Sequence, residues 1–137
     1  MGNDLASSIK TVTALEAQIL SGEGAAVYGP RIDRLNYEAS VISVQTGIGS
    51  GSPANVGVVV KMQHMSGETD WIDVSGMTTT ISGEGAIAHQ NEIDYDLKSS
   101  SRYIRAVATP HFTAGSSPKI EIAATCVLGE PTVYPAS

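Results

Sequence analysis

Apolar and polar residues alternate along much of this chain, and residues that favour turns separate the alternating runs. The clearest run lies near the C-terminal end, where one face carries Ile120, Ile122, Ala124, Cys126 and Leu128. Polar residues lie between them, among them a lysine, a glutamate and a threonine. A period of two places one face of a strand on a core and the other in solvent, as in an antiparallel sheet.

Further runs of this kind precede it, rich in β-branched or aromatic residues and ended by turn residues. They cover residues 36–47, 56–65, 71–82, 91–99 and 101–112. Short strands that follow one another at intervals of about ten residues indicate a sandwich or barrel. No helical periodicity alternates with them, which disfavours a doubly wound α/β fold. We therefore predict an all-β fold, an antiparallel β-sandwich.

The N-terminal segment has an ambiguous pattern. Its apolar residues recur at helical spacing, at Leu5, Ile9, Val12, Leu15 and Ile19. The β-branched residues at positions 11–13 favour a strand instead, so the segment is either a short helix or an extended arm. Glycine and proline in Ser21–Pro30 interrupt it. We expect an N-terminal arm over residues 1–30 and a β-sandwich domain over residues 31–137.

Composition narrows the classes of partner. The chain has 137 residues, within the range of one domain, with 42% hydrophobic and 16% charged residues. Its net charge is −6 and its eight Lys and Arg residues form no run, which disfavours binding to nucleic acid or to an anionic membrane. No apolar stretch approaches the roughly 20 residues that span a bilayer. The N-terminus lacks the basic start and long apolar stretch of an export signal, so we expect assembly in a cytoplasm.

Catalytic and metal-binding patterns are weak. The three histidines lack metal-ligand spacing, and the lone Cys126 lies in an apolar run typical of a buried core residue. Glu92, Asp94 and Asp96 would share one strand face, where carboxylates could hydrolyse glycosides or bind calcium. A calcium loop and a set of sugar-stacking aromatics are missing, which favours a solvated strand face. We expect no enzyme, no metal and no cofactor.

The only tryptophan, Trp71, follows the acidic turn in KMQHMSGETDWIDVSG. An aromatic residue at the start of a hairpin strand commonly anchors the hairpin by burying a large area. We therefore predict a core position for Trp71; the alternative is contact with a ligand or partner.

Arginine and tyrosine alternate in the run Arg102-Tyr103-Ile104-Arg105. Tyr103 and Arg105 should share one strand face, and Arg102 should lie on the other. Both residue types are favoured in protein interfaces. The structural alternative pairs Arg105 with a carboxylate: Asp73, Asp94 or Asp96.

Four segments in order carry a family resemblance: RLNYEASVISVQTG, VVVKMQHMSGETDWIDVSG, SRYIRAVATPHF and KIEIAATCVLGEP. Their counterparts in the family are a "GYES"-like strand, a "V-x-Q-H-S-x-D…W-x-D-V" hairpin and an "RYVRAV" strand. Arg31 to Leu128, the region they span, resembles the head decoration, or cement, proteins of tailed bacteriophages, of the jelly-roll kind. Met65 stands where that family usually has serine.

The resemblance implies a non-enzymatic structural protein of the virion. Such a protein would sit on the outer surface of the expanded capsid, bind the major capsid protein and stabilise contacts between its subunits. It would be a homo-oligomer, with a trimer favoured over a dimer, and would be assembled in the cytoplasm of a bacterial host.

Within this hypothesis the N-terminal segment and one end of the sandwich should make the capsid or oligomer contacts. An apolar, weakly charged segment could bury its side chains in a groove or add a strand to a neighbouring sheet. The candidate contact residues are Leu5, Ile9, Val12, Leu15, Ile19, Leu20, Arg31 and Arg34. Deleting residues up to about Gly24 should then abolish capsid binding and leave a folded sandwich.

Two other functions stay open. Jelly rolls also host carbohydrate-binding modules, which would require exposed aromatic side chains. A minor structural protein of a phage tail or head–tail connector is the other alternative, and its copy number would distinguish it.

Overall fold

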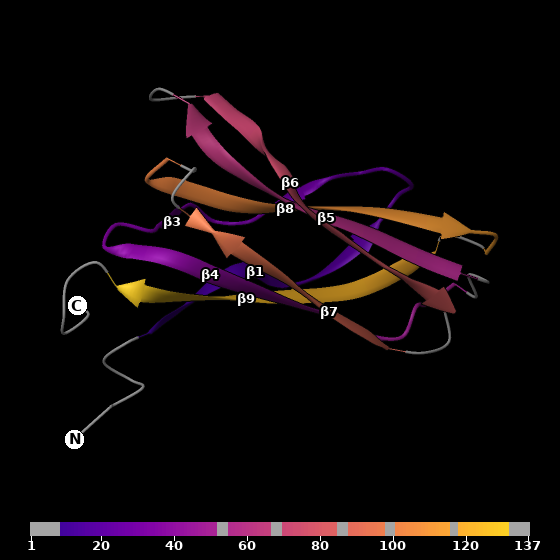
Figure 1. Cartoon of the computed structure of the whole chain (residues 1–137). Coiled ribbons are helices and arrows are strands. Elements are labelled where there is room, and N and C mark those ends of the chain that lie inside the picture. Colours follow the sequence, from indigo (N-terminus) through magenta and orange to yellow (C-terminus); the bar gives the residue numbers. More distant parts are fainter. Residues whose placement is uncertain are drawn as a thin grey trace, which may run out of the picture.

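The described residues form nine strands (Figure 1). The computed structural model describes residues 9–51, 55–66, 70–84, 88–97, 101–115 and 118–131. The strands are β1 (Lys10–Ser21), β2 (Val27–Tyr28), β3 (Ile32–Asp33), β4 (Tyr37–Thr46), β5 (Asn55–Ser66), β6 (Asp70–Glu84), β7 (His89–Asp96), β8 (Tyr103–Thr113) and β9 (Lys119–Pro131). Within the described ranges, no helix is long and apolar enough to cross a lipid bilayer.

The strands form two antiparallel sheets, with the orders β1-β9-β4-β7 and β2-β8-β5-β6, and β3 also pairs with β8. Strands near the two ends of the sequence pair with each other, and strands nearer its middle pair in turn. The first strand pairs with the last, β2 and β3 with β8, β4 with β7, and β5 with β6. If β2 and β3 are counted as one interrupted strand, this is the eight-stranded jelly roll, a long hairpin wrapped into a sandwich. The predicted antiparallel β-sandwich is therefore confirmed.

The inner faces of the two sheets form one hydrophobic core. All five apolar residues of the alternating run in β9, Ile120 to Leu128, are at most 4% exposed. From the opposite sheet, β5 contributes Val56, Val58, Val60 and Met62. Cys126 is fully buried as predicted, and burial raises the pKa of its thiol to about 12. A thiol with such a pKa stays protonated and unreactive at neutral pH.

The expected N-terminal arm is corrected by the structure. Residues 10–21 form β1, a strand that pairs with β9 along its length and lies beside it in Figure 1. Ala14, Leu15 and Leu20 are at most 1% exposed and belong to the core. The boundary at residue 30 therefore does not separate an arm from the sandwich, and deletion up to Gly24 would remove a core strand.

Bulges explain why the pattern in β1 looks helical. The register between β1 and β9 shifts between Thr13 and Leu15, and again between Leu15 and Gln18. Each shift inserts a residue and changes which side chains face the core, so the buried positions lose their period of two. The sequence left helix and strand open, and the pairing with β9 makes this segment a strand.

Candidate functional site

Arginine and aromatic side chains gather on the outer face of the five-stranded sheet. We call the surface formed by Tyr28, Arg31, Trp71, Tyr103 and Arg105 the arginine–aromatic surface. Tyr28 comes from β2, Arg31 from the link between β2 and β3, Trp71 from β6, and the last two from β8. The core-facing residues of β8 alternate with Tyr103 and Arg105, and this alternation turns both side chains away from the core.

Arg105 lies between two aromatic rings. Its Cζ is 4.5 Å from the centroid of the Tyr28 ring and 4.5 Å from that of the Trp71 ring. Its Nε donates a hydrogen bond to Oε1 of Gln63 (2.9 Å), and Nε2 of Gln63 donates to Oδ1 of Asp73 (2.9 Å). Cation–π contacts and this hydrogen-bonded row hold the guanidinium in one orientation.

The register of the strands builds that row. Gln63 of β5 is paired with Arg105 of β8 on one side and with Asp73 of β6 on the other. Directly paired residues project from the same face, which brings the three side chains together. Nζ of Lys61 lies 3.1 Å from Asp73. Hydrogen bonds from Gln63 and Lys61 lower the pKa of Asp73, so its carboxylate is charged at neutral pH.

Tyr103 carries a second cluster of arginines. Cζ of Arg31 is 4.4 Å from the centroid of its ring, and Cζ of Arg102 is 5.1 Å from it. Arg102 also makes a bidentate ion pair with Asp33, with Nε–Oδ1 at 3.0 Å and Nη2–Oδ2 at 2.8 Å. This hydrogen bonding from Arg102 lowers the pKa of Asp33.

Trp71 does not occupy the core position that its place in the hairpin predicted. It pairs with Met65 on the outer face and is only partly buried, with its ring against Arg105. The register of β5 with β6 shifts between Lys61 and Gln63, and this irregularity separates the tip of the hairpin from the regular alternation farther along. The predicted turn residues 67–69 lie outside the described residues.

The structure decides two of the three carboxylate partners predicted for Arg105, Asp73 and Asp94. Arg105 reaches Asp73 through Gln63 rather than by a direct ion pair, and Asp94 lies on β7 of the other sheet. The side chain of Asp96 lies outside the described part of the chain.

The eight predicted contact residues do not form one surface. Leu15 and Leu20 are in the core and Val12 packs against it, so these three do not offer an outer contact in the folded chain. Ile9 is partly buried, and Leu5 lies outside the described residues. Arg31 lies on the arginine–aromatic surface and Ile19 on the other sheet, where it is 61% exposed.

Arg34 has a structural role in the turn before β4. Its Nε donates to the carbonyl oxygen of Ser101 (3.1 Å), and its Nη1 donates to that of Tyr37 (3.3 Å). These bonds tie the start of β4 to the segment that leads into β8. The sequence predicted Arg31 as a contact residue but did not predict Tyr28. Tyr28 lies in a glycine-rich stretch that is too short and irregular to show a period of two.

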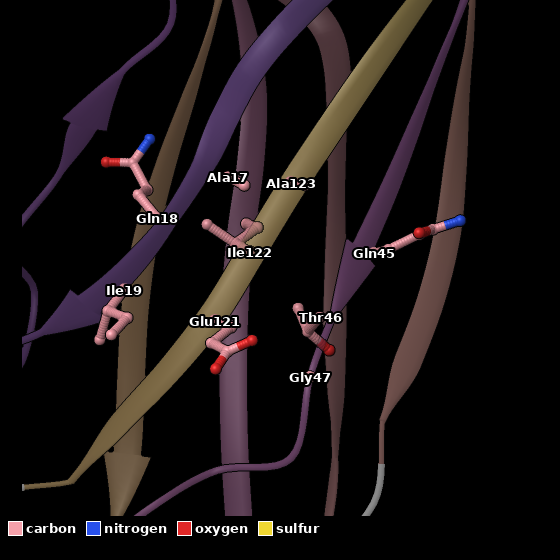
Figure 2. Close-up of a pocket in the computed structure, with 9 residues that line it drawn as sticks. All are labelled: Ala17, Gln18, Ile19, Gln45, Thr46, Gly47, Glu121, Ile122 and Ala123. Atoms are coloured by element: carbon pink, nitrogen blue, oxygen red, sulfur yellow. The ribbon is translucent and has the colours of Figure 1, made fainter.

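A hollow of about 450 Å³ lies on the four-stranded sheet. Its lining comes from β1, β9 and the end of β4: Ala17, Gln18, Ile19, Gln45, Thr46, Gly47, Glu121, Ile122 and Ala123. Figure 2 shows the carboxylate of Glu121 between β9 and Gly47, with Ile19 on the neighbouring strand. The described residues that line the hollow include no aromatic side chain on which a sugar ring could stack.

The histidines lie in three separate places, each with a structural contact. Nδ1 of His64 accepts a hydrogen bond from the backbone N–H of Ser101 (3.0 Å), and Nε2 of His89 lies 3.0 Å from a backbone oxygen at Glu84. Nδ1 of His111 lies 2.6 Å from Oε2 of Glu23. The described residues contain no group of three or more His, Cys, Asp or Glu side chains that could hold a metal ion.

No known family model and no curated protein matches this sequence. Solved structures match the fold. The VP2 subviral particle of infectious bursal disease virus is 8% identical with a TM-score of 0.56, over 93% of this chain and 34% of that one. The chain thus spans about a third of that viral protein.

Sugar-binding proteins match to a similar degree. A putative sugar binding protein from Bacteroides thetaiotaomicron VPI-5482 is 12% identical with a TM-score of 0.54, over 95% of this chain and 86% of that one. A CBM4 carbohydrate-binding module is 9% identical with a TM-score of 0.52, over 90% of this chain and 80% of that one. At these identities the likeness concerns the fold alone: this chain shares a β-sandwich fold with the VP2 of that viral particle, with the putative sugar binding protein and with the CBM4 module.

Proposed function

We propose that this chain is a non-enzymatic decoration, or cement, protein of a tailed-phage capsid. It binds the outer surface of the expanded head through the arginine–aromatic surface and stabilises contacts between subunits of the major capsid protein. The observation that carries this proposal is the composition and order of that surface, in which arginine, tyrosine and tryptophan side chains are held in fixed contacts.

Two of the four segments behind the family resemblance meet on this surface, while the segments that form β4 and β9 lie in the other sheet. The segment Arg102–Val107 begins β8 and supplies Tyr103 and Arg105, and the hairpin of β5 and β6 supplies Gln63 and Trp71. In these two segments the inward residues build the core, as any β-sandwich requires. Outward residues of both segments contribute to the arginine–aromatic surface, which the core does not require.

Arginine, tyrosine and tryptophan are the residue types that contribute most to protein–protein affinity. Side chains that are ordered before binding lose less conformational entropy on association. A protein that binds only the expanded lattice stabilises it by mass action, and a homo-oligomer, with a trimer favoured and a dimer possible, adds avidity. The location that follows is the outer surface of the virion, after assembly in the host cytoplasm.

Expanded heads prepared without this protein provide the direct test. Wild-type protein should co-sediment with them, and quantitative mass spectrometry of purified virions should give about one copy per major capsid protein. Trp71→Ala should weaken binding about tenfold, as expected for a central interface residue. Leu35→Ala is the matched control, because Leu35 is 50% exposed and lies in the turn before β4.

The copy number separates the structural alternatives. A handful of copies per particle would assign the chain to the tail or connector. Its absence from virions, together with no binding to expanded heads, would refute a decoration role.

Carbohydrate binding remains the second candidate, and one observation favours it. Tyr28 is 58% exposed on an open sheet face, and one face of its ring is free of Arg105. A neutral glycan that stacks on this ring would displace water from it and change the emission of the adjacent Trp71. Titration with a neutral glycan panel, with Tyr28→Ala as the control, measures this directly; no change for any glycan would remove the candidate.

A further inference from the structure

Among the described residues, two arginines of the arginine–aromatic surface, Arg31 and Arg105, have no carboxylate partner. The chain has 14 Asp and Glu residues and 8 Lys and Arg residues, so acidic groups are in excess. Beside this surface, Arg102 makes an ion pair with Asp33, and Lys61 makes one with Asp73. Within the part of the chain that the structure describes, no ion pair includes Arg31 or Arg105.

Both guanidinium groups keep hydrogen-bond donors available. Arg105 uses its Nε for Gln63, which leaves both Nη groups. Toward the part of the chain that the structure describes, the contact of Arg31 is with the ring of Tyr103. A guanidinium that stacks by its face on an aromatic ring presents its N–H groups at the edge of the stack. The planar fork of these donors matches the two oxygens of a carboxylate.

The rings fix where these donors are. Arg31 is held 4.4 Å from the ring of Tyr103, and Arg105 lies between Tyr28 and Trp71. Tyr103 and Arg105 are two residues apart on β8, so the two stacks are neighbours on the same outer face. This arrangement presents two cationic forks side by side, at little further cost in side-chain entropy.

We propose that Arg31 and Arg105 form a carboxylate-binding site for an acidic segment of a partner protein. This inference rests on the proposed function, under which the segment belongs to the major capsid protein. Two unpaired cations cannot neutralise a run of phosphates on a chain whose net charge is −6, which argues against nucleic acid. Pairing with Glu92, Asp94 or Glu121 of a second copy is also disfavoured, because these residues lie on the opposite sheet.

Trp71 provides a direct readout, since it is the only tryptophan and its ring contacts Arg105. Its emission should change when poly-L-glutamate is added to the full chain at low ionic strength, and the change should weaken as salt rises. Arg31→Gln and Arg105→Gln should each weaken the apparent affinity about tenfold. Arg31→Gln leaves the contact of Arg105 with Trp71 in place, so its loss of response reflects the ligand and not a changed reporter.

Lys119→Gln is the matched control, because it removes one exposed positive charge at the start of β9, on the other sheet. It should leave the affinity for poly-L-glutamate unchanged. No emission change in the wild type, or an equal loss in Lys119→Gln, would overturn the inference. A stronger response to polygalacturonate than to poly-L-glutamate would also overturn it, by assigning the site to an acidic sugar.

Expanded heads separate this inference from the proposed function. Heads that bind wild type and Arg31→Gln equally well would refute the carboxylate site and leave the decoration role standing. A response to poly-L-glutamate without any binding to heads would refute the decoration role and retain the site.

Discussion

Replacement of Leu15 by alanine tests whether β1 belongs to the core. Leu15 is 1% exposed and lies among the largest fully buried side chains. Leu15→Ala removes three carbon atoms, and burial of each contributes about 0.8 kcal/mol, or about 2.4 kcal/mol together. The cavity that remains adds to this loss, so the free energy of unfolding should fall by about 3 kcal/mol.

A matched variant lies four residues farther along the same strand. Ile19 is 61% exposed, so Ile19→Ala should change the free energy of unfolding by less than about 0.5 kcal/mol. Urea unfolding followed by circular dichroism measures both values. The corresponding drop in Tm for Leu15→Ala is about 10 °C for a domain of this length.

The comparison of the two variants has a clear refuting result. If residues 1–30 were an arm attached to an independent sandwich, neither change would affect the unfolding of the sandwich. Equal, small effects of Leu15→Ala and Ile19→Ala would therefore show that β1 does not pack into the core, and the assignment of a nine-stranded fold would be wrong.

Three further predictions concern single contacts. A methyl group on Gly29 would overlap the carbonyl oxygen of Ala14, a backbone atom that cannot move aside. Gly29→Ala should therefore lower the free energy of unfolding by about 3 kcal/mol, measured by urea unfolding. A neutral effect would contradict the close packing of Gly29 against Ala14. Ser40 is 4% exposed, and its hydroxyl has no hydrogen-bond partner among the described residues. Ser40→Ala should therefore raise the free energy of unfolding by about 1 kcal/mol, measured as a higher melting temperature; a lower melting temperature would reveal a partner. Hydrogen bonds, first from the N–H of Phe112, hold the pKa of Glu23 below its usual 4.5, so this carboxylate stabilises the folded chain above that pH and loses its effect as the pH falls through the lowered value. The difference in Tm between wild type and Glu23→Gln should thus shrink between neutral pH and about pH 3, and a constant difference would argue against the contact.

The sequence by itself determined the class of the fold and most of its core. Period-two runs predicted the segments that became β4 to β9, because in a regular strand the side-chain direction depends only on parity. The inward set of β9, from Ile120 to Leu128, is buried as that parity requires. The short strands β2 and β3 were missed, since two residues are too few to show a period.

Bulges limited what the sequence could determine at β1 and at Trp71. A bulge inserts a residue and reverses the parity that follows, and only pairing with a partner strand fixes where this happens. The shifts in β1 made a core strand look like a helical arm. The shift between Lys61 and Gln63 similarly lies next to the segment in which a predicted core tryptophan proved to be a surface residue.

The sequence placed Tyr103 and Arg105 on one strand face, but tertiary structure decided which other residues join them in the arginine–aromatic surface. Tyr28, Trp71 and Arg105 lie far apart in the sequence. No local sequence pattern around any of them predicts contact with the other two. The order β2-β8-β5-β6 makes their strands neighbours in one sheet, and the register of Gln63 with Arg105 and Asp73 sets the row of contacts. Sequence patterns thus determined which residues leave the core, while strand order and register determined which of them meet, because those contacts are made between strands and not along them.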